Sequence, residues 1–197
     1  MLLDILNEAK SCNQFLEIYM QEDNPNNFLL GYPLEISNDS FIIASVAPNG
    51  LYDGYVYVEI NKVFRLSYNT NYTNNIAYFY KTLHQSHERI DEKDTDLALA
   101  LLKFAYKKHY VVSIELLDEY VSDIRGHVIS FSQNEIYIEL LNSDGKKDGT
   151  TVIFHKDISG ISCDTEEEAK RKLLANRWTI VGLSMMCYRF GKEKRTC

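Results

Sequence analysis

The chain has 197 residues, of which 45% are hydrophobic and 25% charged, and it contains only three Pro and nine Gly. This composition is typical of a globular protein and excludes a largely disordered chain. The formal net charge is −7, and counting Lys and Arg against Asp and Glu places about +7 on residues 170–197 and about −14 on residues 1–169. An acidic body disfavours contact with nucleic-acid phosphates, so only the C-terminal segment favours an anionic partner.

The sequence predicts a cytoplasmic protein without a membrane anchor. Residues 1–10 lack the basic region of a signal peptide. The apolar stretch at 180–187 is far shorter than the roughly 18 residues that a membrane helix needs. The cysteines form no C-x-x-C pair and fit no zinc spacing, as expected for reduced thiols in the cytoplasm; they are Cys12, Cys163, Cys187 and Cys197. We expect no metal and no cofactor.

The first half of the chain alternates between helical and extended patterns. Apolar residues at helical spacing open it, and period-2 alternation on either side of polar turn residues then predicts strands and hairpins. The predicted elements are a helix at 2–9, a strand at 14–20, a hairpin at 33–46, strands at 55–60 and 63–68, and a helix at about 72–88.

A shift of 95 residues places the chain on itself without a gap. Eight of the forty positions in 31–70 are identical to their counterparts in 126–165, and the hydrophobic pattern matches as well. A duplication explains this agreement. The second half therefore opens with a helix, which Asp94 or Thr95 caps, and ends with a helix at 165–176, where Thr165 and Glu168 form a capping box.

Each half is thus predicted to contain five antiparallel strands with flanking helices. Five strands in about 60 residues usually curl into a small barrel, because closure removes exposed edges. The predicted fold class is mainly β with flanking helices (α+β), as two tandem five-stranded barrels of Sm-like or SH3-like type. The predicted domains are 1–92 and 93–197, the latter with a C-terminal extension.

The motif G-x-x-D-G occurs at 50–54 and again at 145–149. A phosphate-binding loop needs backbone N–H groups that converge at a helix N-terminus, but here a strand follows each motif. Asp-Gly before a strand is typical of a turn, because Gly adopts positive φ without steric cost. We predict a repeated turn between the third and fourth strands.

The second half resembles the Sm-like family, in its bacterial Hfq branch. The segments that carry the resemblance are "RGHVISFSQNEIYIEL" at 125–140 and "VIFHKDISGI" at 152–161. The resemblance implies binding of uridine-rich RNA by Phe154, His155 and Lys156. It also implies that a fused pair of barrels can build a pseudo-symmetric ring from a few chains.

Three further groups of residues are candidate sites. Tyrosines are frequent in the first half, and exposed Tyr suits a protein interface; the candidates are Tyr52, Tyr55 and Tyr57. The basic C-terminal segment adds Lys170, Arg171 and Lys172 as RNA-binding candidates. His84, His87 and Glu88 suggest a metal site if 72–88 is one helix, although a polar linker is the simpler interpretation.

No catalytic motif is found, so the first hypothesis is a non-catalytic binding or regulatory protein that interacts with a protein partner or with itself. The second is an RNA-binding Sm-like protein, and the third is an enzyme with a site between the halves. The apolar segment 177–190 either packs between the halves or docks on another chain.

Overall fold

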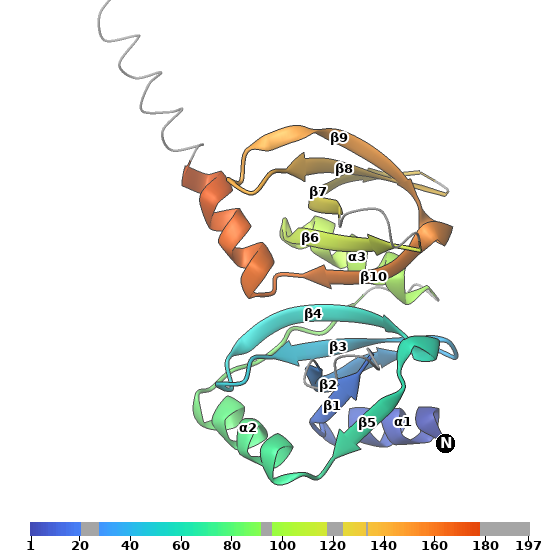
Figure 1. Cartoon of the computed structure of the whole chain (residues 1–197), viewed down its shortest axis with the longest axis vertical. Coiled ribbons are helices and arrows are strands. Elements are labelled where there is room, and N and C mark those ends of the chain that lie inside the picture. Colours follow the sequence, from blue (N-terminus) through green and yellow to red (C-terminus); the bar gives the residue numbers. More distant parts are fainter. Residues whose placement is uncertain (21–27, 92–95, 118–123, 133, 178–197) are drawn as a thin grey trace, which may run out of the picture.

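The computed structural model describes residues 1–20, 28–91, 96–117, 124–132 and 134–177. Its strands form one antiparallel sheet that runs through both halves, with helices packed against it (Figure 1). The first half contains α1 (Leu2–Cys12), β1 (Leu16–Tyr19), β2 (Leu29–Ile36), β3 (Ser40–Val46), β4 (Tyr52–Glu59), the 3₁₀ turn η1 (Ile60–Lys62), β5 (Arg65–Tyr68) and α2 (Asn71–Thr82). The second contains α3 (Leu97–Lys108), β6 (Val111–Leu116), β7 (Ile124–Phe131), β8 (Glu135–Leu141), β9 (Lys147–Phe154), η2 (His155–Asp157), β10 (Ile158–Cys163) and a helix at 166–177.

The two halves repeat each other element by element. The strands β7, β8 and β9 begin 95 residues after β2, β3 and β4, so the shift predicted from the sequence is confirmed for this part of the unit. Upstream of β2 the shift is 96, because Leu16 pairs with Gly31 whereas Val112 pairs with Gly126. The extra residue lies in α3, which is one residue longer than α1.

The prediction of two closed five-stranded barrels is wrong. The strand order is β5-β1-β2-β3-β4-β10-β6-β7-β8-β9, so the ten described strands form one open sheet. The fifth strand of each half pairs with the first, but β4 pairs with β10 of the other half. Because this pairing satisfies the backbone groups between the halves, neither half needs to close on itself. The coarser prediction of strands with flanking helices is confirmed.

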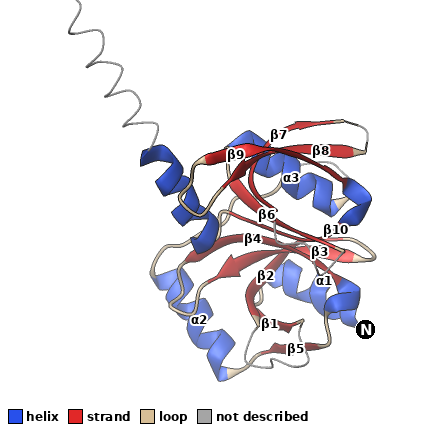
Figure 2. Cartoon of the chain, turned by 45° about the horizontal axis from the view of Figure 1, so that its top comes forward, coloured by secondary structure: helices blue, strands red, loops and turns tan. Residues whose placement is uncertain are grey.

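The sheet bends strongly within each half (Figure 2). A Cβ atom on Gly31 would lie 1.9 Å from the carbonyl oxygen of Ala44, and one on Gly126 would lie 2.0 Å from that of Glu139. At both positions a neighbouring strand approaches closer than any side chain allows, so only glycine fits. An equivalent glycine therefore allows β2 to bend over β3 and β7 to bend over β8.

A shared core joins the halves. The helix α3 contacts β3 and β4 of the first half as well as β6, β7 and β10 of the second. Ile42 and Tyr55 of the first half lie in the same buried cluster as Leu101 and Ile161 of the second. The predicted boundary between residues 1–92 and 93–197 falls at residues 92–95, outside the described residues.

The helix ends follow local signals in the sequence. Asp96 caps α3 by accepting a hydrogen bond from the Leu99 N–H, while the predicted caps Asp94 and Thr95 lie outside the described residues. One of the two bonds of the predicted capping box of the last helix is present, because the Thr165 N–H donates to the Glu168 carboxylate at 2.9 Å. Across the described residues, every helix is too short or too polar to cross a membrane.

Candidate functional site

The junction between β4 and β10 is the place where the two copies of the unit meet. Tyr57 pairs with Ile161, and Tyr55 pairs with Cys163 two residues further along. The side chains of Tyr55 and Cys163 are almost completely buried, with 1% and 0% exposed. The pairing therefore combines backbone hydrogen bonds with an apolar contact between the halves.

The first G-x-x-D-G motif contributes directly to this junction. The predicted turn between β3 and β4 forms at Gly50, which has a positive φ of 80°, and not at the Asp-Gly pair on which the prediction relied. Asp53 lies beyond the turn, in β4, and its Oδ1 accepts a 2.8 Å hydrogen bond from the backbone N–H of Glu166, the first residue of the last helix. A Cβ on Gly54 would lie 2.3 Å from the carbonyl oxygen of Cys163. Gly54 thus leaves room for the chain of the other half, and Asp53 bonds to the first N–H of its last helix.

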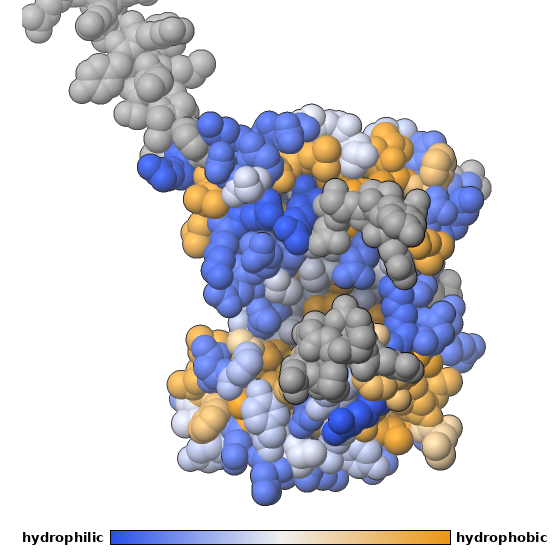
Figure 3. All heavy atoms as spheres, in the orientation of Figure 1, coloured by the Kyte–Doolittle hydropathy of each residue, from blue (hydrophilic) through white to orange (hydrophobic). Residues whose placement is uncertain are grey.

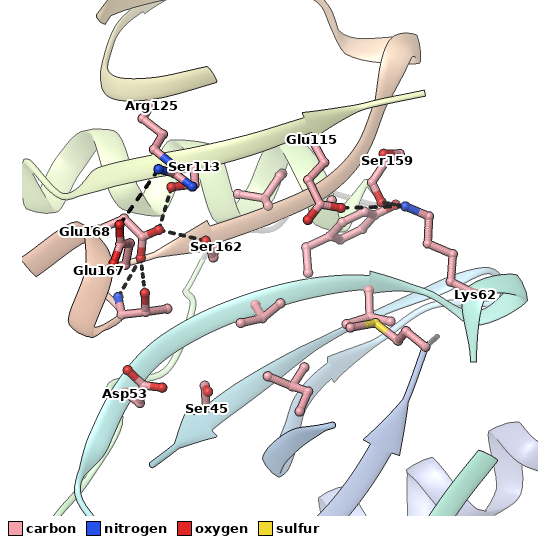
Figure 4. Close-up of a pocket in the computed structure, with 18 residues that line it drawn as sticks. Ser45, Asp53, Lys62, Ser113, Glu115, Arg125, Ser159, Ser162, Glu167 and Glu168 are labelled. Carbon is pink, nitrogen blue, oxygen red and sulfur yellow. Dashed lines mark hydrogen bonds and ion pairs between the residues drawn. The ribbon is translucent and has the colours of Figure 1, made fainter. Parts of the chain in front are cut away.

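A cavity of about 300 Å³ lies along this junction (Figure 4). On the second half the cavity is lined by Glu168, which is 2% exposed and accepts hydrogen bonds from Ser113 at 2.6 Å and Ser162 at 2.9 Å. The hydroxyl of Thr165 donates to the same carboxylate. Buried carboxylates need such donors, so these hydroxyls stabilise the charge inside the protein.

The remaining charges that the cavity exposes are paired with each other across the junction or within the second half. Lys62 of the first half donates to the Ser159 carbonyl at 2.8 Å and lies 4.0 Å from Glu115. Arg125 lies 3.8 Å from Glu167. Lys62 thus links the two halves through one hydrogen bond and one long, partly exposed ion pair, which contributes little by itself.

A cluster of aromatic side chains surrounds His87 next to the junction. The ring of His87 lies within 6 Å of the rings of four tyrosines, which are Tyr32, Tyr52, Tyr55 and Tyr80. Its Nε2 lies 2.9 Å from the carbonyl oxygen of Gly54, which only accepts, so Nε2 carries the proton. Nδ1 then accepts from the Tyr80 hydroxyl at 2.7 Å. Burial lowers the pKa of His87 to about 4, so the ring is neutral at pH 7.

The three tyrosine candidates do not form an exposed face. Tyr55 is buried, and Tyr52 and Tyr57 are half-buried and pack against the same cluster of apolar side chains. The Tyr52 hydroxyl donates to Asp164 at 2.8 Å across the junction. These tyrosines therefore join the two halves of one chain, and an external protein reaches Tyr55 only if the junction opens.

The candidates from the Sm-like resemblance do share a pocket. Phe154, His155 and Lys156 line a hollow of about 600 Å³ together with Ser132, Asn134 and Glu135 of the β7–β8 turn. Phe154 is 49% exposed, and His155 Nε2 lies 3.1 Å from Asp96 Oδ2. This pocket presents one aromatic face and one exposed ammonium group.

The basic residues of the last helix do not extend that pocket. The pocket lies before β10 and the helix follows β10, so the two groups are at opposite ends of this strand (Figure 1). Lys170 pairs with Glu166 at 2.6 Å, and Arg171 donates to the Asn142 carbonyl at 3.0 Å. Lys172 lies 4.9 Å from the centre of the Tyr110 ring. These contacts hold the three side chains against their own half of the protein.

The predicted metal alternative is not formed. The helix α2 ends at Thr82, and His84 has a positive φ of 53°, so the two histidines do not share a helix face. His87 lies in the aromatic cluster, and Glu88 pairs with Lys108 at 2.5 Å. Within the described part of the chain no three potential metal ligands are grouped. The apolar segment 177–190 lies outside the described residues, apart from Arg177.

Among the described residues the sheet ends at β5 and β9, which the sequence did not single out. Both strands carry exposed apolar side chains. On or beside β5 these are Phe64 at 41% and Tyr68 at 43% exposure, and on β9 they are Val152 at 46% and Phe154 at 49%. Apolar side chains are visible on the surface over β8 and β9 in Figure 3. An unpaired edge with apolar side chains is a site for pairing with another strand.

Comparison of the chain with protein-family models, with curated proteins and with solved structures found no match.

Proposed function

We propose that the chain is a non-catalytic, cytoplasmic protein that acts by protein–protein interaction and binds further strands at the free edges of its sheet. The observation that carries the proposal is the β4–β10 junction. By the 95-residue shift, β9 corresponds to β4 and β5 corresponds to β10. The chain thus joins two units through one pair of strands, and the same two kinds of strand end its sheet.

The exposed apolar side chains on β5 and β9 favour the binding of another strand at these edges. Proteins usually protect an open edge with charges, prolines or bulges. These edges do carry charges, which are Lys147 and Asp148 on β9 and Arg65 on β5, and the β8–β9 pairing has an irregular register. Val152 and Tyr68 nevertheless leave apolar side chains exposed there, at positions whose counterparts in the junction are Tyr57 and Cys163. Main-chain hydrogen bonds would supply affinity to a strand added at either edge, and these side chains would supply specificity.

A charged residue on β9 is expected to prevent this interaction. Val152→Lys places an ammonium group on the edge where a strand would pair, and lysine is an effective edge blocker. Multi-angle light scattering of the purified wild-type chain should show assemblies larger than one chain at high protein concentration, and the variant should shift toward the monomer. The matched control is Ile129→Lys, because Ile129 is 42% exposed but lies on β7, which has strands on both sides.

Two results would contradict the proposal. One is a wild-type chain that stays monomeric at every concentration and retains no protein in pull-downs. The other is an equal loss of association in Val152→Lys and Ile129→Lys, since that would trace the effect to surface charge in general and not to the edge.

RNA binding at the Phe154 pocket is a second candidate function. It is favoured by the exposed ring of Phe154 next to Lys156, whose side chain is 82% exposed. An aromatic face beside a cation suits a stacked base and its phosphate. The resemblance to the Sm-like family stays a prediction that supports the same assignment.

For this candidate, Lys156→Ala should weaken binding of a uridine-rich RNA at low salt and reduce the slope of log affinity against log salt by about 1. Fluorescence anisotropy with labelled RNA provides the measurement. Lys81→Ala, on the exposed surface of α2, is the control and should leave the slope unchanged. If the wild-type chain gives no anisotropy change at low salt, RNA binding is excluded as its activity.

A further inference from the structure

The second G-x-x-D-G motif occupies, on the free edge β9, the place that the first motif occupies at the junction. Asp148 and Gly149 are exposed and lie 95 residues after Asp53 and Gly54. At the junction Asp53 and Gly54 contact the end of β10 and the start of the next helix. The corresponding segment of the first half, the end of β5 and the start of α2, lies at the other end of the sheet.

The backbone at Gly149 leaves room for an incoming chain. Gly54 and Gly149 both have positive φ, at 68° and 92°. A Cβ on Gly54 would meet the carbonyl oxygen of Cys163 at 2.3 Å, but a Cβ on Gly149 would meet nothing within 4 Å. The glycine therefore has a positive φ at both places, while among the described residues only Gly54 has another segment next to it.

The acid beside this glycine has a defined role at the junction. Asp53 accepts from the N–H of Glu166, and Asn71, the first residue of α2, is the counterpart of Glu166. A carboxylate at a helix N-terminus satisfies a backbone donor and favours the helix dipole. Asp148 could accept a hydrogen bond from the first N–H of α2 in another copy. Without such a contact, an exposed Asp within a strand is unfavourable.

The pairing register of the junction predicts which side chains would meet at such a contact. Tyr55 pairs with Cys163 at the junction, so Thr150 would pair with Tyr68 of another copy, and Val152 with Leu66. Continuing the register by two residues brings Phe154 opposite Phe64 of that copy. Both rings are more than 40% exposed in the single chain. Cross-strand aromatic pairs stabilise sheets, so this contact would bury the apolar side chains on both edges.

We propose that a second copy of this chain is the partner of β9, and that it seats its β5 there in the register of the junction. In this contact Asp148 accepts a hydrogen bond from the backbone N–H of Asn71 of the next copy, next to Thr70, which is the N-cap of that α2. The inference rests on the proposed function and specifies its partner. Because the contact joins different surfaces of identical chains, repetition gives a ring if the rotation closes and a filament if it does not.

Disulfide trapping tests the register. In a background with serine at Cys12, Cys187 and Cys197, chains carrying Thr150→Cys are mixed with chains carrying Tyr68→Cys and oxidised. Paired positions have Cα atoms close enough for a disulfide, so a covalent dimer is expected. Replacing Tyr68→Cys by Arg65→Cys moves the thiol three residues out of register and should give at least tenfold less dimer.

Substitution of Asp148 tests this hydrogen bond. Asp148→Ala should weaken association about fivefold to tenfold, as loss of one hydrogen bond does, while Asp148→Asn should weaken it less, because its amide oxygen can still accept from the Asn71 N–H. Asp144→Ala, in the turn before β9, is the control for charge. Sedimentation velocity over a concentration series provides the dissociation constants.

The outcomes separate this inference from the function on which it rests. A wild-type chain that neither associates nor binds another protein overturns both. Association that is blocked by Val152→Lys but is unaffected by Asp148→Ala, or that gives the same dimer yield with both cysteine pairs, overturns the proposed seating and leaves edge binding standing. A ring or a filament that is trapped through Thr150 and Tyr68 and weakened by Asp148→Ala supports it.

Discussion

Tyr55→Ala is expected to lower the free energy of unfolding by about 3–5 kcal/mol, the range for removal of a buried aromatic ring. Tyr55 is 1% exposed, and its ring lies 5.1 Å from that of Phe104, 5.2 Å from that of His87 and 6.0 Å from that of Tyr52. These neighbours come from β4, α3 and the segment between the halves, so the cavity left behind lies where the halves join. Urea denaturation followed by circular dichroism measures the loss.

Two variants divide this effect into its parts. Tyr55→Phe keeps the ring but removes the hydroxyl, which donates to the Glu88 carbonyl and accepts from the Glu88 N–H. It should cost about 1 kcal/mol. Tyr78→Ala removes a ring that is 65% exposed and should change the stability by less than about 0.5 kcal/mol. If Tyr55→Ala costs no more than Tyr78→Ala, the ring is not part of a shared core.

Much of the secondary structure could be predicted because each half carries the same local signals. Alternation in 33–46 and 128–141 gave both hairpins, and the pattern of Thr165 and Glu168 gave the start of the last helix. Such signals depend on residues that are close in sequence, and a duplication presents them twice. The repeat also aligned the two Asp-Gly pairs, which have equivalent positions in β4 and β9.

The closure of the sheet could not be predicted in the same way. The residues of β4 are those of a strand whether the strand pairs with β5 or with β10, because the backbone donors and acceptors are the same. The choice depends on what the side chains meet across the pair. Here Tyr55 meets Cys163, 108 positions along the chain, and His87, 32 positions along it.

The prediction that Tyr52, Tyr55 and Tyr57 form a protein interface depended on their exposure, which contacts between distant parts of the chain also decide. Their number suggested that some are exposed, and Tyr78 is, but Tyr55 fills the junction. One signal in the sequence does distinguish the two halves. In the described part of the chain each half has one buried glutamate, but on different elements. In the first half it is Glu17 of β1, which accepts from Thr70 at the start of α2. In the second half it is Glu168 of the last helix, which accepts from Ser113 of β6. This change of element keeps one buried carboxylate and its hydroxyl donor in each unit.

Lowering the pH from 7 to 5 is expected to remove about 2 kcal/mol of stability through His87 alone. Burial lowers the pKa of His87 in the folded chain to about 4, from 6.5 in the unfolded chain. Between these values the unfolded chain binds a proton that the folded chain excludes, so stability falls as the pH falls through this window. Burial also lowers the pKa of His127, which adds a loss of the same sign.

The variant His87→Gln isolates this contribution. Urea unfolding at pH 7 and pH 5 should show a smaller difference in the variant than in the wild type, by about 2 kcal/mol, because glutamine does not titrate. Burial raises the pKa of Asp53 and Asp164, which acts in the opposite direction near pH 4, but both carboxyl groups are present in wild type and variant. His84→Gln, at an exposed position, should keep the wild-type difference. An unchanged difference in His87→Gln would mean that the ring is already accessible to protons in the folded chain and that the aromatic cluster does not hold it neutral.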